Sequence, residues 1–170
     1  MSSTGVAPAP VSANSSQAAV EQKLRLQAKV RTGAGWLMAV AAFSVINSVL
    51  VISNANLHFI VGLGITQITD GMGKSTGSAG ASAGVIVSLF MAGIFALFWK
   101  FARQEQQWAF ITGMVIYALD GLIFLGFGIF LDFAFHLYAL YCMFLGLKAL
   151  TQLHKLNASS SNFAVSSTIG

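Results

Sequence analysis

Charged side chains are scarce in this chain. It has 9 Lys and Arg and 5 Asp and Glu among 170 residues, or 8%, whereas an average soluble domain carries about 25%. A soluble globule of this size needs a charged surface, and these residues cannot supply one. Hydrophobic residues make up 56% of the chain. The composition therefore excludes a disordered chain, all but excludes a soluble enzyme, and predicts an integral membrane protein.

Cysteine and proline are also scarce. The chain has 1 Cys, Cys142, and 2 Pro, so that an intramolecular disulfide and a CxxC redox pair are excluded. Both prolines lie in residues 1–20, which are small and polar and lack the apolar core of a signal peptide. We therefore predict a disordered N-terminal tail over residues 1–20, followed by uncleaved spans.

Four apolar segments are long enough to be membrane spans. Each has roughly 20 residues, which covers about 30 Å of hydrocarbon at about 1.5 Å per residue. The fold class predicted for residues 33–150 is therefore an all-α, four-helix transmembrane bundle, followed by a polar C-terminal tail over residues 151–170. The expected spans are about 33–53, 80–100, 108–125 and 129–150.

The basic residues indicate the orientation. Residues 21–32 form a basic juxtamembrane segment, which is typical of a topology signal and suited to anionic lipid headgroups. With four spans, eight of the nine Lys and Arg lie on or next to the side of the two termini, which the positive-inside rule places in the cytoplasm. Nucleic-acid binding is disfavoured because the segment abuts a span and has no interleaved aromatic residues. Its cations are Lys23, Arg25, Lys29 and Arg31.

The connection between the first two spans contains a further, shorter apolar segment. Residues 57–72 (LHFIVGLGITQITDGM) are too short to cross the bilayer. We predict a short amphipathic helix in the outer interface, and a re-entrant lid over an internal site is the alternative. Residues 71–76 (GMGKST) look like the end of a P-loop, but Ile68 stands where the first glycine is needed and no strand precedes it. Neither nucleotide binding nor a cofactor is therefore expected.

Small residues recur at every fourth position of the second span. Such a face lets a neighbouring helix approach closely, and this matters in lipid because the hydrophobic effect does not drive helices together there. We expect the face to pack inside the bundle, and a homodimer interface is the alternative. Its residues are Gly80, Gly84, Ser88, Ala92 and Ala96.

Three ionisable residues lie within the last two spans. Asp132 and His136 share a helical face at i, i+4, and a turn near residues 127–128 would bring His136 to the depth of Asp120. A carboxylate in the bilayer costs about 2.5–3.5 kcal/mol, so that a partner is expected. Asn47 and Tyr117 could supply further polar contacts to this intramembrane cluster.

The cluster admits several roles. An interhelical clamp is the leading interpretation, and a proton or ion pathway is the second. Asp120, Asp132, His136 and His58 have the chemistry of metal ligands, but their spacing matches no recognised motif and no metal is expected. An enzyme is disfavoured because no G-x-S-x-G surrounds the serines of the spans.

One part of the chain resembles a known family. Residues 44–48 (SVINS), residues 59–67 (FIVGLGITQ) and Asp70 are similar to a family of small uncharacterised bacterial four-span inner-membrane proteins. The resemblance implies a bacterial inner-membrane location and a specific role for the loop, and it transfers no catalytic residue.

Two functions remain open at this point. The first is a non-catalytic structural or accessory subunit, with the lipid bilayer and a homo-oligomer or larger membrane complex as its partners. The second is a small proton- or ion-coupled transporter or channel that uses Asp120 and His136.

Overall fold

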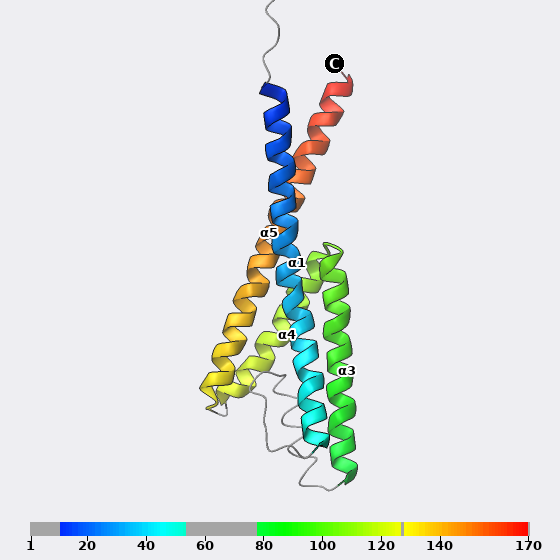
Figure 1. Cartoon of the computed structure of the whole chain (residues 1–170), viewed down its shortest axis with the longest axis vertical. Coiled ribbons are helices and arrows are strands. Elements are labelled where there is room, and N and C mark those ends of the chain that lie inside the picture. Colours follow the sequence, from blue (N-terminus) through cyan, green and yellow to red (C-terminus); the bar gives the residue numbers. More distant parts are fainter. Residues whose placement is uncertain (1–10, 54–77, 127, 170) are drawn as a thin grey trace, which may run out of the picture.

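Four helices make up the described structure. The computed structural model describes residues 11–53, 78–126 and 128–169. Each helix contains a stretch that is long and apolar enough to cross a membrane, so the predicted all-α, four-span membrane architecture is confirmed. The helices are α1 (Val11–Ile52), α3 (Ser78–Arg103), α4 (Gln107–Gly126) and α5 (Phe130–Ile169) (Figure 1).

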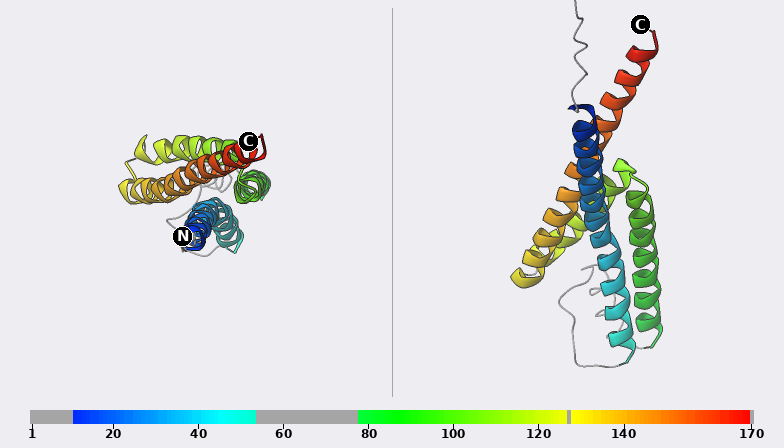
Figure 2. Two further views of the ribbon diagram at one scale, coloured as in Figure 1. Left: turned by 90° about the horizontal axis from the view of Figure 1, so that it is seen from above. Right: turned by 45° about the horizontal axis from the view of Figure 1, so that its top comes forward.

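The helices form a ring of neighbours. α1 packs against α3 and α5, and α4 packs against the same two helices (Figure 2). The connection from α3 to α4 is short and contains Glu105, and the connection from α4 to α5 contains Gly128. Gly128 has a φ of 71°, a conformation that glycine adopts without steric cost. Short connections make α3, α4 and α5 successive antiparallel neighbours.

The helices differ in length. α1 and α5 have 42 and 40 residues, whereas α3 and α4 have 26 and 20. At about 1.5 Å per residue the two long helices reach about 60 Å. Their outer parts project beyond the α3–α4 turn, from the same end of the bundle (Figure 1). We call this the terminal end, and we call the opposite end, where α1 ends and α3 begins, the loop end.

The sequence-based boundaries differ from those of the helices. Residues 11–20, which we expected to be disordered, belong to α1, and residues 21–32 continue the same helix into the first span. The expected polar tail after residue 150 continues α5 as far as Ile169. The rest of the expected tail, residues 1–10, and the expected interfacial helix over residues 57–72 lie outside the described residues.

The charged residues separate along the bundle. Every Lys and Arg that the structure describes lies toward the terminal end, and Lys74 is the one that falls in the undescribed segment. The geometry thus gathers the cations as the four-span scheme requires. They are Lys23, Arg25, Lys29, Arg31, Lys100, Arg103, Lys148 and Lys155.

The small-residue face of α3 points into the bundle where it is described. Ser88 and Ala92 are buried and Ala96 is partly buried. Gly80 and Gly84 belong to the first turns of α3, whose packing lies outside the described residues. The described part of this face therefore lies against neighbouring helices of the same chain.

α1 and α5 cross in close backbone contact. A Cβ added at Gly33 would lie 2.5 Å from the Cα of Gly146, and one added at Gly146 would lie 2.7 Å from the Cα of Gly33. The two backbones thus touch where side chains are absent, which maximises van der Waals contact between the helices. Next to the crossing, the Trp36 ring packs on Phe135 and Tyr138 at centroid distances of 6.1 and 5.4 Å.

Candidate functional site: a buried aspartate–histidine pair

Buried polar side chains gather at one end of the bundle. They come from the second half of α1, the first half of α3, the second half of α4 and the first turns of α5, which all belong to the loop end. Toward the terminal end the described core is apolar, with residues such as Val30 and Leu150 fully enclosed. The buried polar residues are Ser44, Asn47, Ser48, Ser88, Asp120, Asp132 and His136.

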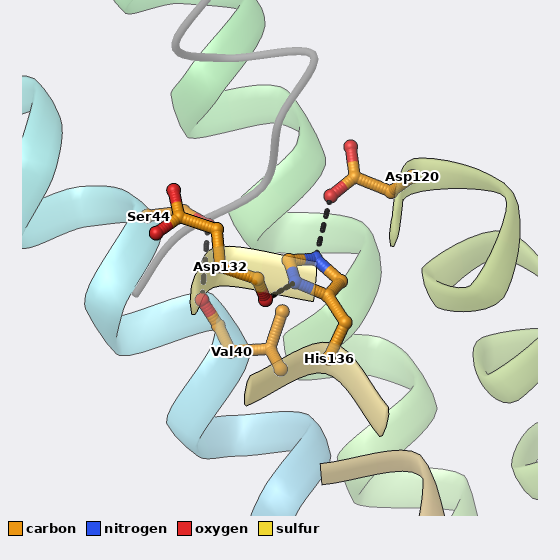
Figure 3. Close-up of polar contacts among 5 residues, drawn as sticks. All are labelled: Val40, Ser44, Asp120, Asp132 and His136. Atoms are coloured by element: carbon orange, nitrogen blue, oxygen red, sulfur yellow. Dashed lines mark hydrogen bonds and ion pairs between the residues drawn. The ribbon is translucent and has the colours of Figure 1, made fainter. Parts of the chain in front are cut away.

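Asp120 and His136 form the centre of this group. His136 Nε2 lies 3.0 Å from Asp120 Oδ2, and His136 Nδ1 lies 2.9 Å from the backbone oxygen of Asp132 (Figure 3). The side chains of Asp120 and His136 are only 5% and 1% exposed. The contact agrees with the prediction that His136 lies at the same depth as Asp120, because a short turn at Gly128 fixes the register of α4 against α5.

One face of α4 forms a slot for the imidazole. Tyr117 stacks on the His136 ring with a centroid distance of 4.3 Å and an interplanar angle of 17°. The Phe124 ring lies against the same imidazole, with a centroid distance of 5.0 Å. The two aromatic residues stand seven positions apart, about 10 Å along the helix axis, so that the imidazole lies between them. Gly121 leaves the space into which the histidine fits.

The hydrogen-bond pattern fixes the number of protons that the pair holds. A backbone carbonyl only accepts, so His136 Nδ1 must carry a hydrogen and donate it to the Asp132 oxygen. The contact between Nε2 and Asp120 Oδ2 then needs one more proton, which resides on the imidazole or on the carboxyl group. The pair is an ion pair in the first case and a neutral pair in the second. Its net charge is zero in both, which lowers the cost of placing it in a membrane.

Asp132 contributes its backbone to the pair. Its carboxylate points away from the imidazole (Figure 3), although the side chain is buried. Asp132 lies in the first turn of α5, where the helix dipole stabilises a negative charge. The cluster predicted from the sequence therefore divides into the Asp120–His136 pair and a separate carboxylate at the start of α5.

The other two predicted partners do not hydrogen-bond to the pair. Tyr117 reaches His136 through its ring. The amide nitrogen and oxygen of buried Asn47 have no hydrogen-bond partner among the described residues, and the same is true of the Ser88 hydroxyl. Ser44 and Ser48 donate to backbone oxygens of α1 itself, at 2.9 and 3.1 Å. α1 thus adds polar groups at the same end of the bundle.

The described residues around the Asp120–His136 pair do not form a metal-binding group. Within residues 11–53, 78–126 and 128–169, no three His, Cys, Asp or Glu side chains come together in a way that could hold a metal ion. His58, the fourth ligand considered from the sequence, lies outside the described residues. The chemistry that the described residues support is the sharing of one proton between the Asp120 carboxyl group and the His136 imidazole.

Comparison with known proteins gives no relative. No protein-family model matches the chain, and neither does any curated protein or solved structure. The functional argument therefore depends on the geometry of the Asp120–His136 pair and on the distribution of charge.

A substitution at Gly121 tests the slot. A Cβ at this position would lie 3.1 Å from the Cβ of His136 and 3.2 Å from two of its ring atoms. We expect Gly121→Ala to cost about 1 kcal/mol of unfolding free energy relative to Gly93→Ala, because the imidazole must shift by a few tenths of an ångström. Gly93 is a matched control, since a Cβ there meets no atom within 4 Å. Equal unfolding free energies in a detergent titration would show that the slot is not tight.

Proposed function

We propose that this protein is a non-catalytic structural or accessory membrane protein and that the Asp120–His136 pair clamps α4 to α5. The observation that carries the proposal is that the hydrogen-bonding capacity of the His136 imidazole is fully used within the protein. Both ring nitrogens have protein partners, and the ring lies between Tyr117 and Phe124. A general base needs a lone pair within reach of a substrate proton, and the His136 ring nitrogens are already engaged.

The proposal includes a location and an orientation. The protein resides in a bacterial cytoplasmic membrane with the terminal end in the cytoplasm. The gathering of the described cations at that end supports this orientation, because basic residues are retained on the cytoplasmic side. The bacterial location depends only on the sequence resemblance noted for residues 44–48 and 59–67, since no protein-family model matches the chain. As a subunit, the protein would work in a homo-oligomer or a larger membrane assembly.

One observation favours a second function, proton- or ion-coupled transport. The pair holds a proton that two groups share, and intramembrane ionisable residues often mark ion pathways. Asn47 and Ser88, from two other helices, bring further polar atoms without hydrogen-bond partners in the described structure to the same end of the bundle. A water-filled path at the loop end would satisfy these atoms.

A flux measurement separates the two functions. Purified protein is reconstituted into liposomes that contain a pH-sensitive dye, and a pH gradient is imposed. The clamp proposal predicts that wild-type and Asp120→Asn liposomes lose the gradient at the same rate as protein-free liposomes. A wild-type rate several times the protein-free rate, abolished in folded Asp120→Asn protein, would replace the clamp with the transport function.

A further inference from the structure

A groove opens between α1 and α5 at the terminal end of the bundle. Its volume is about 490 Å³, and its walls are two facing stripes of side chains. Gly33, at the helix crossing, forms part of its floor. The groove is distinct from the Asp120–His136 pair, which lies toward the loop end.

The groove changes character along its length. α1 and α5 are antiparallel, so residues that come later in α1 lie beside residues that come earlier in α5. One end of the groove therefore has the polar side chains Lys29, Thr32, Lys148 and Gln152, and the other has Trp36 and Leu145. A molecule that fits it needs a polar, negatively charged head and an apolar tail.

Two hydrogen bonds set the depth of the polar end. Gln27 Nε2 donates to Glu105 Oε1 at 3.3 Å, and Gln107 Nε2 donates to Thr151 Oγ1 at 3.4 Å. Both bonds join a long helix to the α3–α4 turn, where the short helices end. Lys29 lies two residues from Gln27 and Lys148 lies three residues from Thr151, so that each lysine is within about one helical turn, or about 5 Å, of one of these hydrogen bonds. Both lysines lie on the side of the bonds that faces the spans. The two lysines therefore lie at the headgroup level of a membrane.

The charges of the groove call for an anion. Lys29 and Lys148 are exposed cations in the same groove, and none of the residues that line it is acidic. Two acidic side chains near this end of the groove already have partners: Glu21 forms an ion pair with Arg25, and Glu105 accepts the hydrogen bond from Gln27. Two cations with no carboxylate between them repel each other and attract a phosphate.

We propose that this groove binds one anionic phospholipid, with its phosphate between Lys29 and Lys148 and an acyl chain along Trp36 and Leu145. The apolar half distinguishes a lipid from free phosphate, which would leave that half unused. The proposal also narrows the sequence-based expectation of headgroup contacts. Of the four cations at the start of the chain only Lys29 lines the groove, and its partner comes from α5.

Native mass spectrometry of the detergent-solubilised chain tests the proposal. The protein is titrated with phosphatidylglycerol, with phosphatidylcholine, and with inorganic phosphate as a competitor. We expect one retained phosphatidylglycerol per chain, bound about thirtyfold more weakly by the double variant Lys29→Gln/Lys148→Gln, since each cation contributes about five- to sixfold in affinity. Phosphatidylcholine should be retained much less, and millimolar phosphate should not displace the anionic lipid.

A matched control removes the same charge elsewhere on the same helices. Lys23→Gln/Lys155→Gln changes two exposed lysines of α1 and α5 that do not line the groove. It should bind phosphatidylglycerol within about twofold of the wild type. Equal losses in the two double variants would show diffuse attraction without a site and would overturn the proposal. Equal retention of the two lipids, or displacement by phosphate, would also overturn it.

Discussion

Replacing Gly33 with alanine is expected to lower the unfolding free energy of the bundle by about 2–3 kcal/mol. The added Cβ would lie 2.5 Å from the Cα of Gly146 and 3.0 Å from its backbone nitrogen. Backbone atoms cannot rotate away as a side chain can, so α1 and α5 must separate along their crossing. The loss belongs at the upper end of the range for overpacked cores. An SDS titration of the purified protein, followed by circular dichroism, measures it.

Gly35 provides the control for this substitution. It lies two positions away on the same helix, and a Cβ there meets no atom within 4 Å. Gly35→Ala should leave the protein as stable as the wild type or up to about 1 kcal/mol more stable, because alanine favours the helix. If Gly33→Ala were tolerated as well as Gly35→Ala, the close crossing of α1 and α5 would be wrong.

The second large effect is expected at Asp120. Asp120→Leu should cost about 2 kcal/mol, because the lone pair on Nε2 of a neutral His136 is left buried without a donor. Asp120→Asn should cost less than about 1 kcal/mol. The imidazole can become neutral while Nδ1 still donates to Asp132, and the asparagine amide can then donate to Nε2. The same SDS titration ranks the two variants.

Ser88 supplies the control for removing a buried polar group. Its hydroxyl has no hydrogen-bond partner in the described part of the chain, so Ser88→Ala should leave the stability within about 0.5 kcal/mol of the wild type or raise it. A loss in Asp120→Asn as large as that in Asp120→Leu would mean that the clamp needs the carboxylate charge. The shared-proton description of the pair would then be wrong.

The four spans and the Asp120–His136 contact could be predicted because each depends on local rules. Apolar segments of about 20 residues specify spans whatever their neighbours are. The contact follows from the short turn at Gly128, which gives the two residues equal depth, and from the cost of an unpartnered carboxylate in lipid. The slot made by Tyr117 and Gly121 follows less directly, because it also requires the rotation of α4 toward α5.

The ends of the long helices and the α1–α5 contacts could not be predicted in this way. Extending an existing helix through residues 11–20 needs no new nucleation, so a polar composition there does not stop it. Gly33 and Gly146 each stand outside any repeated small-residue pattern, and their contact depends on how two helices far apart in the sequence face each other. The groove that contains Lys29 and Lys148 depends on the same relation.

A double-mutant cycle on Asp120→Leu and His136→Leu is the most direct test of the clamp. Each single change removes one side of the Asp120–His136 hydrogen bond and leaves the other side buried, whereas the double change removes both groups. With the 3.0 Å contact between Nε2 and Oδ2, the clamp predicts that the double variant loses less unfolding free energy than the two single variants together, by about 1–2 kcal/mol. Losses that add to within about 0.3 kcal/mol would contradict the clamp.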